Sequence, residues 1–451
     1  EVKTSPHFEV PRILKARLAN GISLRVVERR DVPKVSTALM INAGATAETF
    51  DCTGLSSMTV EMLEEGTTTR TSLEIEAEFD RLGSHLSAGG SREWSVVALD
   101  ALKRHLPTSL ELVADVVLNP TFPEEELERL RKQRLDNMLQ EKVSPTSIAG
   151  KALRKCLFGS AHPYGWPVSG IEKSIIEMRR TDLEQFYLDR YTPEDSVLIM
   201  VGDIDLEEGQ QLAEQAFGDW RKPKTASKIL VESVKPVSQA TYFANRSGAA
   251  QSELRIAKLG PPRATHDYYV LEVLTTILGG GFSGRLNLNL REDKGYTYGA
   301  FAAIRYSSFQ SILVASTSVE SSVTRKAIDE LLFEFESLST WSRPITHQEL
   351  NHAKDSLVRG FAQRFETLSQ VAGEIAELDG FGLKKEELNR YCEEVENVSL
   401  GELEVVAKKY LGLEDAILVV VGDGDKLETE VSALAFGKLQ HVDNCGDLIN
   451  Q

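Results

Sequence analysis

The stretch that decides how this chain folds is GGGFSGRLNLNLREDKGYTYG, residues 279–299. An apolar helical pattern, Tyr269 to Leu278, leads into the three glycines, and a second helical run, Gly284 to Glu292, breaks at Gly295. The alternating segment Tyr296 to Ala303 is typical of a strand. The stretch therefore predicts two consecutive helices that deliver the chain into a strand.

Two side chains of this unit are candidates for chemistry. Arg291 lies at the end of the second predicted helix and Tyr298 in the strand, so one turn separates them and both can point into one cleft. A cation and a phenol held together suit the binding and polarising of a peptide carbonyl. The alternative is a salt-bridged surface arginine beside a half-buried strand tyrosine.

Composition limits the classes of function. A chain of 451 residues, 41% hydrophobic and 26% charged, is typical of a globular protein of two to four domains. A net charge of -17 argues against a nucleic-acid binder, which would carry a basic surface. Apolar runs such as Val197 to Val201 fall far short of the roughly 18 residues that span a membrane.

Compartment and redox state are only weakly indicated. The chain begins at Glu1, without Met and without an apolar signal region, which is expected either for a bacterial periplasmic protein after signal removal or for a cytoplasmic one. The four cysteines form no C-x-x-C pair, so free or buried thiols are expected.

An internal repeat divides the chain. Tyr191–Asp203 and Leu411–Asp423 align at a constant offset of 220 residues, and each contains a buried strand that ends in Gly-Asp. Each copy follows a helical pattern, Asp182–Asp189 in the first and Glu402–Lys409 in the second. The repeat predicts two similar halves.

We therefore predict an α+β fold with domains at residues 1–222 and 236–451, joined by a polar linker near Lys222–Lys228. Segments such as Leu24–Glu28 and Val35–Ile41 are strand-like. Each half is expected to hold a mostly antiparallel sheet with helices packed on one face, and two such halves facing each other would enclose a cavity.

A second stretch in the first half carries a resemblance. GLSSMTVEMLEEGT, residues 54–67, predicts a short helix ending at Gly66, and it resembles the helix of the pitrilysin/insulinase-like peptidases, the inverted zincins, which carry H-x-x-E-H there. In that motif two histidines bind Zn²⁺ and the glutamate handles the proton of the zinc-bound water. In this chain the three positions are Ser57, Val60 and Glu61.

The resemblance implies that this chain holds no zinc. The family's third ligand, a glutamate on a later helix, is expected near Asp136, which leaves at best two carboxylates and no imidazole. His347 and His352 are five residues apart and do not share a helix face. Structural or surface roles are expected for these and for the remaining histidines, which are His7, His85, His105, His162, His266 and His441.

Further motifs extend the resemblance over most of the chain. They are His162-Pro163-Tyr164-Gly165 with Gly170 in the first half, and Leu278–Gly281, Ser283, Arg285-Leu286, Leu290–Glu292 and Gly295-x-x-Tyr298 in the second. For the triple glycine at 279–281 a helix cap and turn is favoured over a loop that lets peptide pass. Ser87–Ser91 lies where the family pairs substrate with an edge strand, and a structural role is expected for it here.

The resemblance implies a role for the whole chain. In these peptidases an arginine and a tyrosine of the second half contact the substrate backbone opposite the zinc, and here they are Arg291 and Tyr298. The chain is thus expected to be the zinc-lacking subunit of a heterodimeric, mitochondrial-processing-peptidase-like enzyme. It would be inactive alone and active with a homologous partner that holds Zn²⁺ and cleaves peptides or unfolded segments. The alternatives are a proteolytically silent structural subunit and a peptide-binding module.

Overall fold

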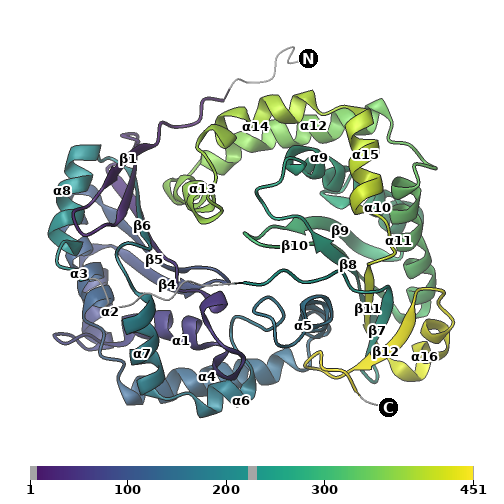
Figure 1. Ribbon diagram of the computed structural model, residues 1–451, viewed down its shortest axis with the longest axis horizontal. Coiled ribbons are helices and arrows are strands. Elements are labelled where there is room, and N and C mark those ends of the chain that lie inside the picture. The colour runs from purple at the N-terminus through teal and green to yellow at the C-terminus, as the bar shows by residue number, and fades with distance from the viewer. Residues whose placement is uncertain (1–7, 222–230, 450–451) are drawn as a thin grey trace.

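The computed structural model describes residues 8–221 and 231–449, which form two halves, each built on one sheet (Figure 1). The predicted linker at Lys222–Lys228 and His7 lie outside the described residues. The first sheet contains β1 (Leu14–Arg17), β2 (Ser23–Glu28), β3 (Lys34–Ile41), β4 (His85–Gly90), β5 (Ser95–Leu102) and β6 (Ser196–Gly202). The second contains β7 (Ala240–Asn245), β8 (Gln251–Gly260), β9 (Thr297–Arg305), β10 (Ser311–Glu320), β11 (Ile417–Gly422) and β12 (Lys438–Val442).

Helices surround both sheets. In the first half they are α1 (Leu55–Glu61), α2 (Ser72–Leu82), α3 (Leu106–Leu118), α4 (Glu124–Glu141), α5 (Pro145–Phe158), α6 (Glu172–Glu177), α7 (Arg180–Arg190) and α8 (Leu206–Phe217). In the second they are α9 (Tyr268–Gly279), α10 (Arg285–Asn287), α11 (Thr324–Ser339), α12 (His347–Phe361), α13 (Leu368–Gly380), α14 (Glu386–Asn397), α15 (Leu400–Tyr410) and α16 (Gly424–Ser432). No helix in the described part of the chain is long and apolar enough to cross a membrane.

The two sheets correspond in five of their six strands, and the sixth is β1 at one edge of the first sheet and β12 at that edge of the second. Their strand orders are β1-β2-β6-β3-β5-β4 and β12-β7-β11-β8-β10-β9. Neighbouring strands are antiparallel except for β2–β6 in the first sheet and β7–β11 and β7–β12 in the second. The strands predicted from the 220-residue repeat are β6 and β11, and both lie inside their sheets after the predicted helices α7 and α15. The α+β class and the two similar halves are confirmed.

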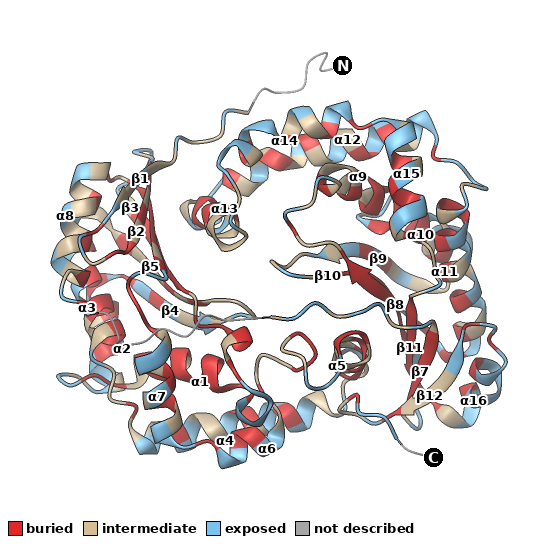
Figure 2. Ribbon diagram, in the orientation of Figure 1, coloured by how far each residue is buried: buried red, intermediate tan, exposed pale blue. Residues whose placement is uncertain are grey.

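Each sheet is covered on both faces, which explains its almost continuous apolar strands. The helices of its own half cover one face, for example α3 on β5 and α11 on β8 and β10. The other face receives one helix from the opposite half (Figure 1): α13 packs on β3 and β6, and α5 packs on β8 and β11. Figure 2 shows the resulting burial of the inner strands. The exchange of α5 and α13 holds the halves together through apolar surface.

The unit around residues 279–299 has the predicted order, with one refinement. Helix α9 leads to α10, the second helical run then continues as a π-helix, η5 (Leu288–Asp293), and Gly295 turns the chain into β9 with φ +65°. A side chain on Gly279 would place its Cβ 2.7 Å from the backbone nitrogen of Ala302. Close packing of α9 on β9 therefore requires glycine at position 279, whereas none of Gly279, Gly280 and Gly281 has a positive φ.

Candidate functional site

An arginine side chain occupies the place where the family motif would hold a metal. Helix α1 presents Ser57 and Glu61 toward α4, and Arg134 of α4 reaches between them. Its Nη1 donates to Ser57 Oγ at 2.7 Å and its Nη2 to Glu61 Oε2 at 2.5 Å. The Arg134 side chain is only 9% exposed, so its guanidinium fills the space between Ser57 and Glu61 inside the protein.

These groups do not fit a zinc ion. Zinc in proteins takes thiolate, neutral imidazole or free carboxylate ligands. Here Val60 is fully buried among apolar side chains, and the one carboxylate, that of Glu61, is neutralised by a guanidinium. Among the residues that the structure describes, no three His, Cys, Asp or Glu side chains gather in a way that could hold a metal.

The expectation that Asp136 lies near this position is wrong. Asp136 is exposed on the outer side of α4, whereas Leu127, Arg134 and Met138 are its buried residues. Positions 127, 134 and 138 are seven and four residues apart and share one helix face, whereas position 136 is turned about 200° away from 134. The apolar spacing of this helix was the signal that could have identified Arg134.

Two carboxyl groups flank α1, a buried one at Glu48 and a half-buried one at Glu64. Glu48 accepts hydrogen bonds from the backbone N–H groups of Gly54 at 3.0 Å and Ser56 at 2.7 Å, at the N-terminus of the helix. Burial raises the pKa of Glu48 to about 7, although these bonds and the nearby Arg134 charge oppose the shift. Burial likewise raises the pKa of Glu64, after the helix, to about 7. The first half thus uses its polar groups to tie α1 in place.

In the second half the predicted pair lies on consecutive elements. Arg291 is in η5, with its guanidinium 4.7 Å from the centre of the Phe282 ring and its Nε 3.5 Å from Glu292 Oε1. Tyr298 is in β9, the edge strand of the sheet, and it is 91% exposed. Although η5 packs against β9, no hydrogen bond joins Arg291 to Tyr298 within the described residues.

Tyr298 borders a large cavity. The cavity has a volume of about 800 Å³ and is lined by residues 295–298, by the ends of β8 and β10, and by Lys426 and Glu430 of α16. Arg291 is not among its lining residues. The free chain therefore offers the phenol and the guanidinium on neighbouring parts of its surface.

Other side chains of this region hold the fold. Arg285 is 3% exposed and binds both carboxylate oxygens of Glu349 in α12, at 2.6 and 3.1 Å. His352 shares a hydrogen bond of 2.7 Å with Ser283, and the ring of His162 contacts the carbonyl oxygen of Glu232 at 2.9 Å. The contacts of these two histidines are structural, as expected. All four cysteines are free thiols, also as expected.

The chain matches two models of a single family. Residues 25–158 match the model described as insulinase, peptidase family M16, and residues 177–357 match the peptidase M16 inactive domain. The uncharacterized zinc protease YmxG of Bacillus subtilis is 24% identical over 408 residues, which cover 90% of this chain and 97% of that protein. The mitochondrial-processing peptidase subunit beta of Lentinula edodes is 24% identical, covering 91% of this chain and 90% of that protein. The subunit alpha of Solanum tuberosum is 30% identical, covering 63% and 56%.

Solved structures agree on the fold. The crystal structure of a peptidase M16 inactive domain from Pseudomonas fluorescens superimposes with a TM-score of 0.85 at 23% identity, covering 91% of this chain and 98% of that one. A protease from Helicobacter pylori gives a TM-score of 0.84 at 19% identity, covering 92% and 100%. At these identities the likeness establishes the fold alone.

Proposed function

The chain belongs to the M16 (insulinase) peptidase family, and on that premise we propose that it is the zinc-lacking subunit of a heterodimeric zinc peptidase. A homologous partner would carry the H-x-x-E-H helix and its Zn²⁺, and this chain would supply Arg291 and Tyr298 together with part of the cavity wall. The substrate would be a peptide or an unfolded segment. That two of its relatives are named as subunits of one peptidase supports the pairing.

The observation that carries this proposal is the exposure of Tyr298. A tyrosine that is 91% exposed on an edge strand adds little to the stability of its own chain, because it buries almost no surface. Its hydroxyl group is free to donate to a ligand, and the neighbouring cavity of about 800 Å³ provides room for one.

Arg291 suits the same task. The Phe282 ring supports its guanidinium at 4.7 Å, and within the described part of the chain Glu292 is the one carboxylate paired with it, at 3.5 Å. N–H groups therefore remain for a substrate. As a substrate carbonyl becomes a tetrahedral oxyanion, the phenol of Tyr298 and the guanidinium of Arg291 would donate to the developing charge. Loss of one such donor commonly raises the barrier by ~3–4 kcal/mol.

The first half contributes no chemistry in this proposal. Because Arg134 already neutralises Glu61, and Val60 carries no ionisable group, α1 cannot activate a water molecule. Activation of the water and proton transfer to the leaving amine would belong to the partner. The role of this chain is to bind and orient the peptide and to stabilise the charge on its carbonyl oxygen.

The test is reconstitution with a homologous chain that carries H-x-x-E-H, preferably from the same genome. Neither chain alone should cleave a quenched fluorescent peptide, and the mixture should form a heterodimer that does. Arg291→Ala and Tyr298→Phe should each lower kcat about 10²-fold with the heterodimer intact on size-exclusion chromatography.

Arg359→Ala is the matched control, because Arg359 lies on the exposed side of α12 with a side chain that is 63% exposed. It should leave kcat unchanged. Absence of any complex would refute the pairing. A complex whose turnover survives both substitutions would leave a structural subunit as the better description.

A further inference from the structure

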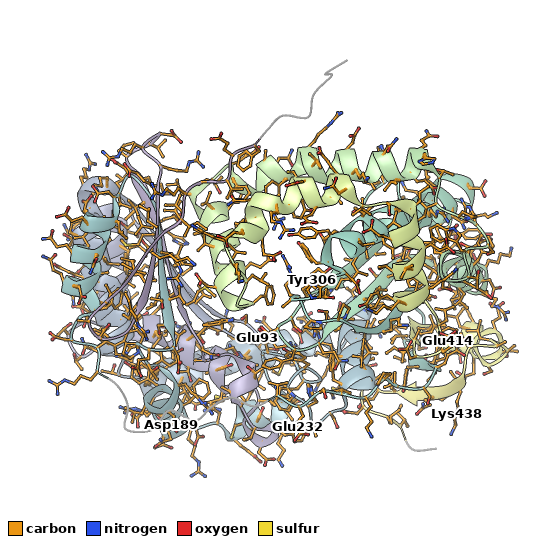
Figure 3. All side chains as sticks on the ribbon, turned by 45° about the horizontal axis from the view of Figure 1, so that its top comes forward. Glu93, Asp189, Glu232, Tyr306, Glu414 and Lys438 are labelled. Atoms are coloured by element: carbon orange, nitrogen blue, oxygen red, sulfur yellow. The ribbon has the colours of Figure 1, made fainter. Side chains whose placement is uncertain are left out.

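Three arginines line two adjoining cavities between the halves. The cavities have volumes of about 270 and 370 Å³, and Arg92, Arg154 and Arg305 belong to the walls of both. Arg92 precedes β5, Arg154 is in α5, and Arg305 ends β9. Glu93 and Tyr306, the sequence neighbours of two of these arginines, mark this junction near the centre of the molecule in Figure 3.

None of the three guanidinium groups forms an ion pair with a carboxylate in residues 8–221 and 231–449. Arg92 donates through Nη1 to the carbonyl oxygens of Pro163 at 2.6 Å and Trp166 at 3.1 Å, which orients it without neutralising it. The guanidinium groups of Arg154 and Arg305 form no hydrogen bond with the described residues. Arg92 and Arg154 are half-buried and Arg305 is exposed, so a ligand can reach them.

The carboxylates that line the cavities are engaged elsewhere. Glu141 pairs with Lys151 at 2.7 Å, Glu377 pairs with Arg263 at 3.5 Å, and Glu93 accepts from the Tyr164 hydroxyl at 2.6 Å and the Ser308 N–H at 2.9 Å. A fourth arginine in the wall, Arg255, is paired with Glu253 at 3.0 Å. The charges of Glu48 and Glu93 act on Arg92, but no carboxylate of the described residues forms an ion pair with any of the other three arginines.

Such a cluster is unfavourable for the free chain. Burial and the charges of Arg92, Arg305 and Arg255 lower the pKa of Arg154 to about 9. The chain has 68 Asp and Glu residues against 51 Lys and Arg, so a shortage of carboxylates does not explain why these arginines lack ion pairs. Three arginines without ion pairs in one junction therefore do little to stabilise the fold, and their guanidinium groups are available to bind anions.

We propose that these cavities bind the carboxylate groups of an extended, acidic peptide. Three cations from separate elements over two adjoining cavities match several spaced carboxylates better than one small ion. Trp94, Phe158 and Tyr306 in the wall of the larger cavity would receive apolar side chains of the peptide. A nucleic acid is the alternative polyanionic ligand, and the experiment below distinguishes it from an acidic peptide.

This inference names a substrate class for the proposed peptidase and rests on that function only for the fate of the bound peptide. The binding itself belongs to this chain and is measured without a partner. If reconstitution fails while the chain still binds the peptide, the proposed function alone is refuted. If reconstitution succeeds while the chain does not bind the peptide, the binding site alone is refuted.

The experiment measures fluorescence anisotropy of a labelled peptide of alternating Glu and Phe with the full chain. The same peptide with Gln in place of Glu should bind at least tenfold more weakly, and added NaCl should weaken binding of the acidic peptide. Inorganic phosphate and a single-stranded RNA serve as competitors and should displace the peptide poorly. Equal affinity for the Glu and Gln peptides, or displacement by phosphate or RNA at concentrations comparable with the peptide, would overturn the assignment.

Arg154→Gln and Arg305→Gln should each reduce affinity for the acidic peptide about tenfold, whereas Arg359→Gln should leave it within twofold. Arg154→Gln should also raise the Tm of the free chain, because it removes charge repulsion. A merely structural arginine would lower the Tm on replacement. A lower Tm with unchanged peptide affinity would show that Arg154 supports the fold and would refute the site.

Discussion

Each half holds an arginine–glutamate pair between two of its helices, and the two pairs serve different purposes. In the first half Arg134 of α4 meets Glu61 of α1 at 2.5 Å, and in the second Arg285 of α10 meets Glu349 of α12 at 2.6 Å. Arg285 is 3% exposed and also binds two backbone carbonyl oxygens, whereas the Glu61 side chain is 40% exposed. The second pair anchors a helix, and the first fills the position where the H-x-x-E-H motif would hold a metal.

The comparison also separates side chains with several internal partners from side chains with few. Burial acts to raise the pKa of Glu349, but hydrogen bonds from Arg285 and Thr346 outweigh it and lower the pKa overall. In the same half Tyr298 remains exposed and Arg291 is only loosely paired. Side chains with a full set of internal partners support the fold, and those without such partners are the ones available to a substrate.

The largest effect on stability is expected from Arg285→Met. It removes the charged partner of the Glu349 carboxylate and the donor to two carbonyl oxygens, so the free energy of unfolding should fall by about 3 kcal/mol. Urea unfolding followed by circular dichroism measures this. Arg325→Met, which breaks the exposed pair with Asp329, should change it by less than about 0.5 kcal/mol. Similar losses for both variants would contradict the anchoring role.

Arg134→Met should lower the free energy of unfolding by less, about 2 kcal/mol. The Glu61 carboxylate is partly exposed, so water can solvate it when its partner is removed. The same unfolding experiment applies, and the ratio of the two losses is the informative quantity. A larger loss for Arg134→Met than for Arg285→Met would reverse the assignment of the two pairs.

Each half also packs its first helix on its edge strand through glycine. In the second half Gly279 of α9 approaches Ala302, and in the first Gly90 of β4 would place a Cβ 2.9 Å from Ser57 Cα. Gly279→Ala and Gly90→Ala should each lower the free energy of unfolding by about 1–2 kcal/mol. Gly281→Ala is the matched control, since its Cβ would meet open space, and it should be neutral within about 0.5 kcal/mol. A costly Gly281→Ala would show that the whole loop, rather than one contact, requires glycine.

The smallest effect concerns Glu64, whose pKa rises from 4.5 to about 7 on burial. A carboxyl group with a raised folded-state pKa destabilises the fold once pH exceeds its unfolded value, and the penalty is complete above about pH 7. Glu64→Gln should therefore stabilise the chain by about 1 kcal/mol at pH 8 and have no effect at pH 4. Glu76→Gln, at an exposed position, is the matched control and should change the free energy of unfolding by less than about 0.5 kcal/mol. A stabilisation that is equal at both pH values would rule out the titration of Glu64 as its cause.

Much of the secondary structure could be predicted because its signals are local. Periodicity and glycine placement identified α9, β9 and the turn at Gly295, and the repeat identified β6 and β11. The absence of H-x-x-E-H was equally evident from the sequence, because Ser57 and Val60 carry neither an imidazole nor a carboxylate, whatever their surroundings. The sequence did not reveal that Arg134 lies between Ser57 and Glu61. The family's spacing pointed to Asp136, and only the buried face of α4 distinguishes Arg134 from Asp136.

By itself, the sequence determined that the chain has two related α+β halves and that residues 57, 60 and 61 do not form H-x-x-E-H, since both follow from residue identities read along the chain. The tertiary structure alone decided that α5 and α13 cover the sheets of opposite halves, and that Arg92, Arg154 and Arg305 meet at one junction. Those contacts join segments far apart in the chain, and they arise from the burial of apolar faces that can pack in more than one arrangement until the whole fold selects one.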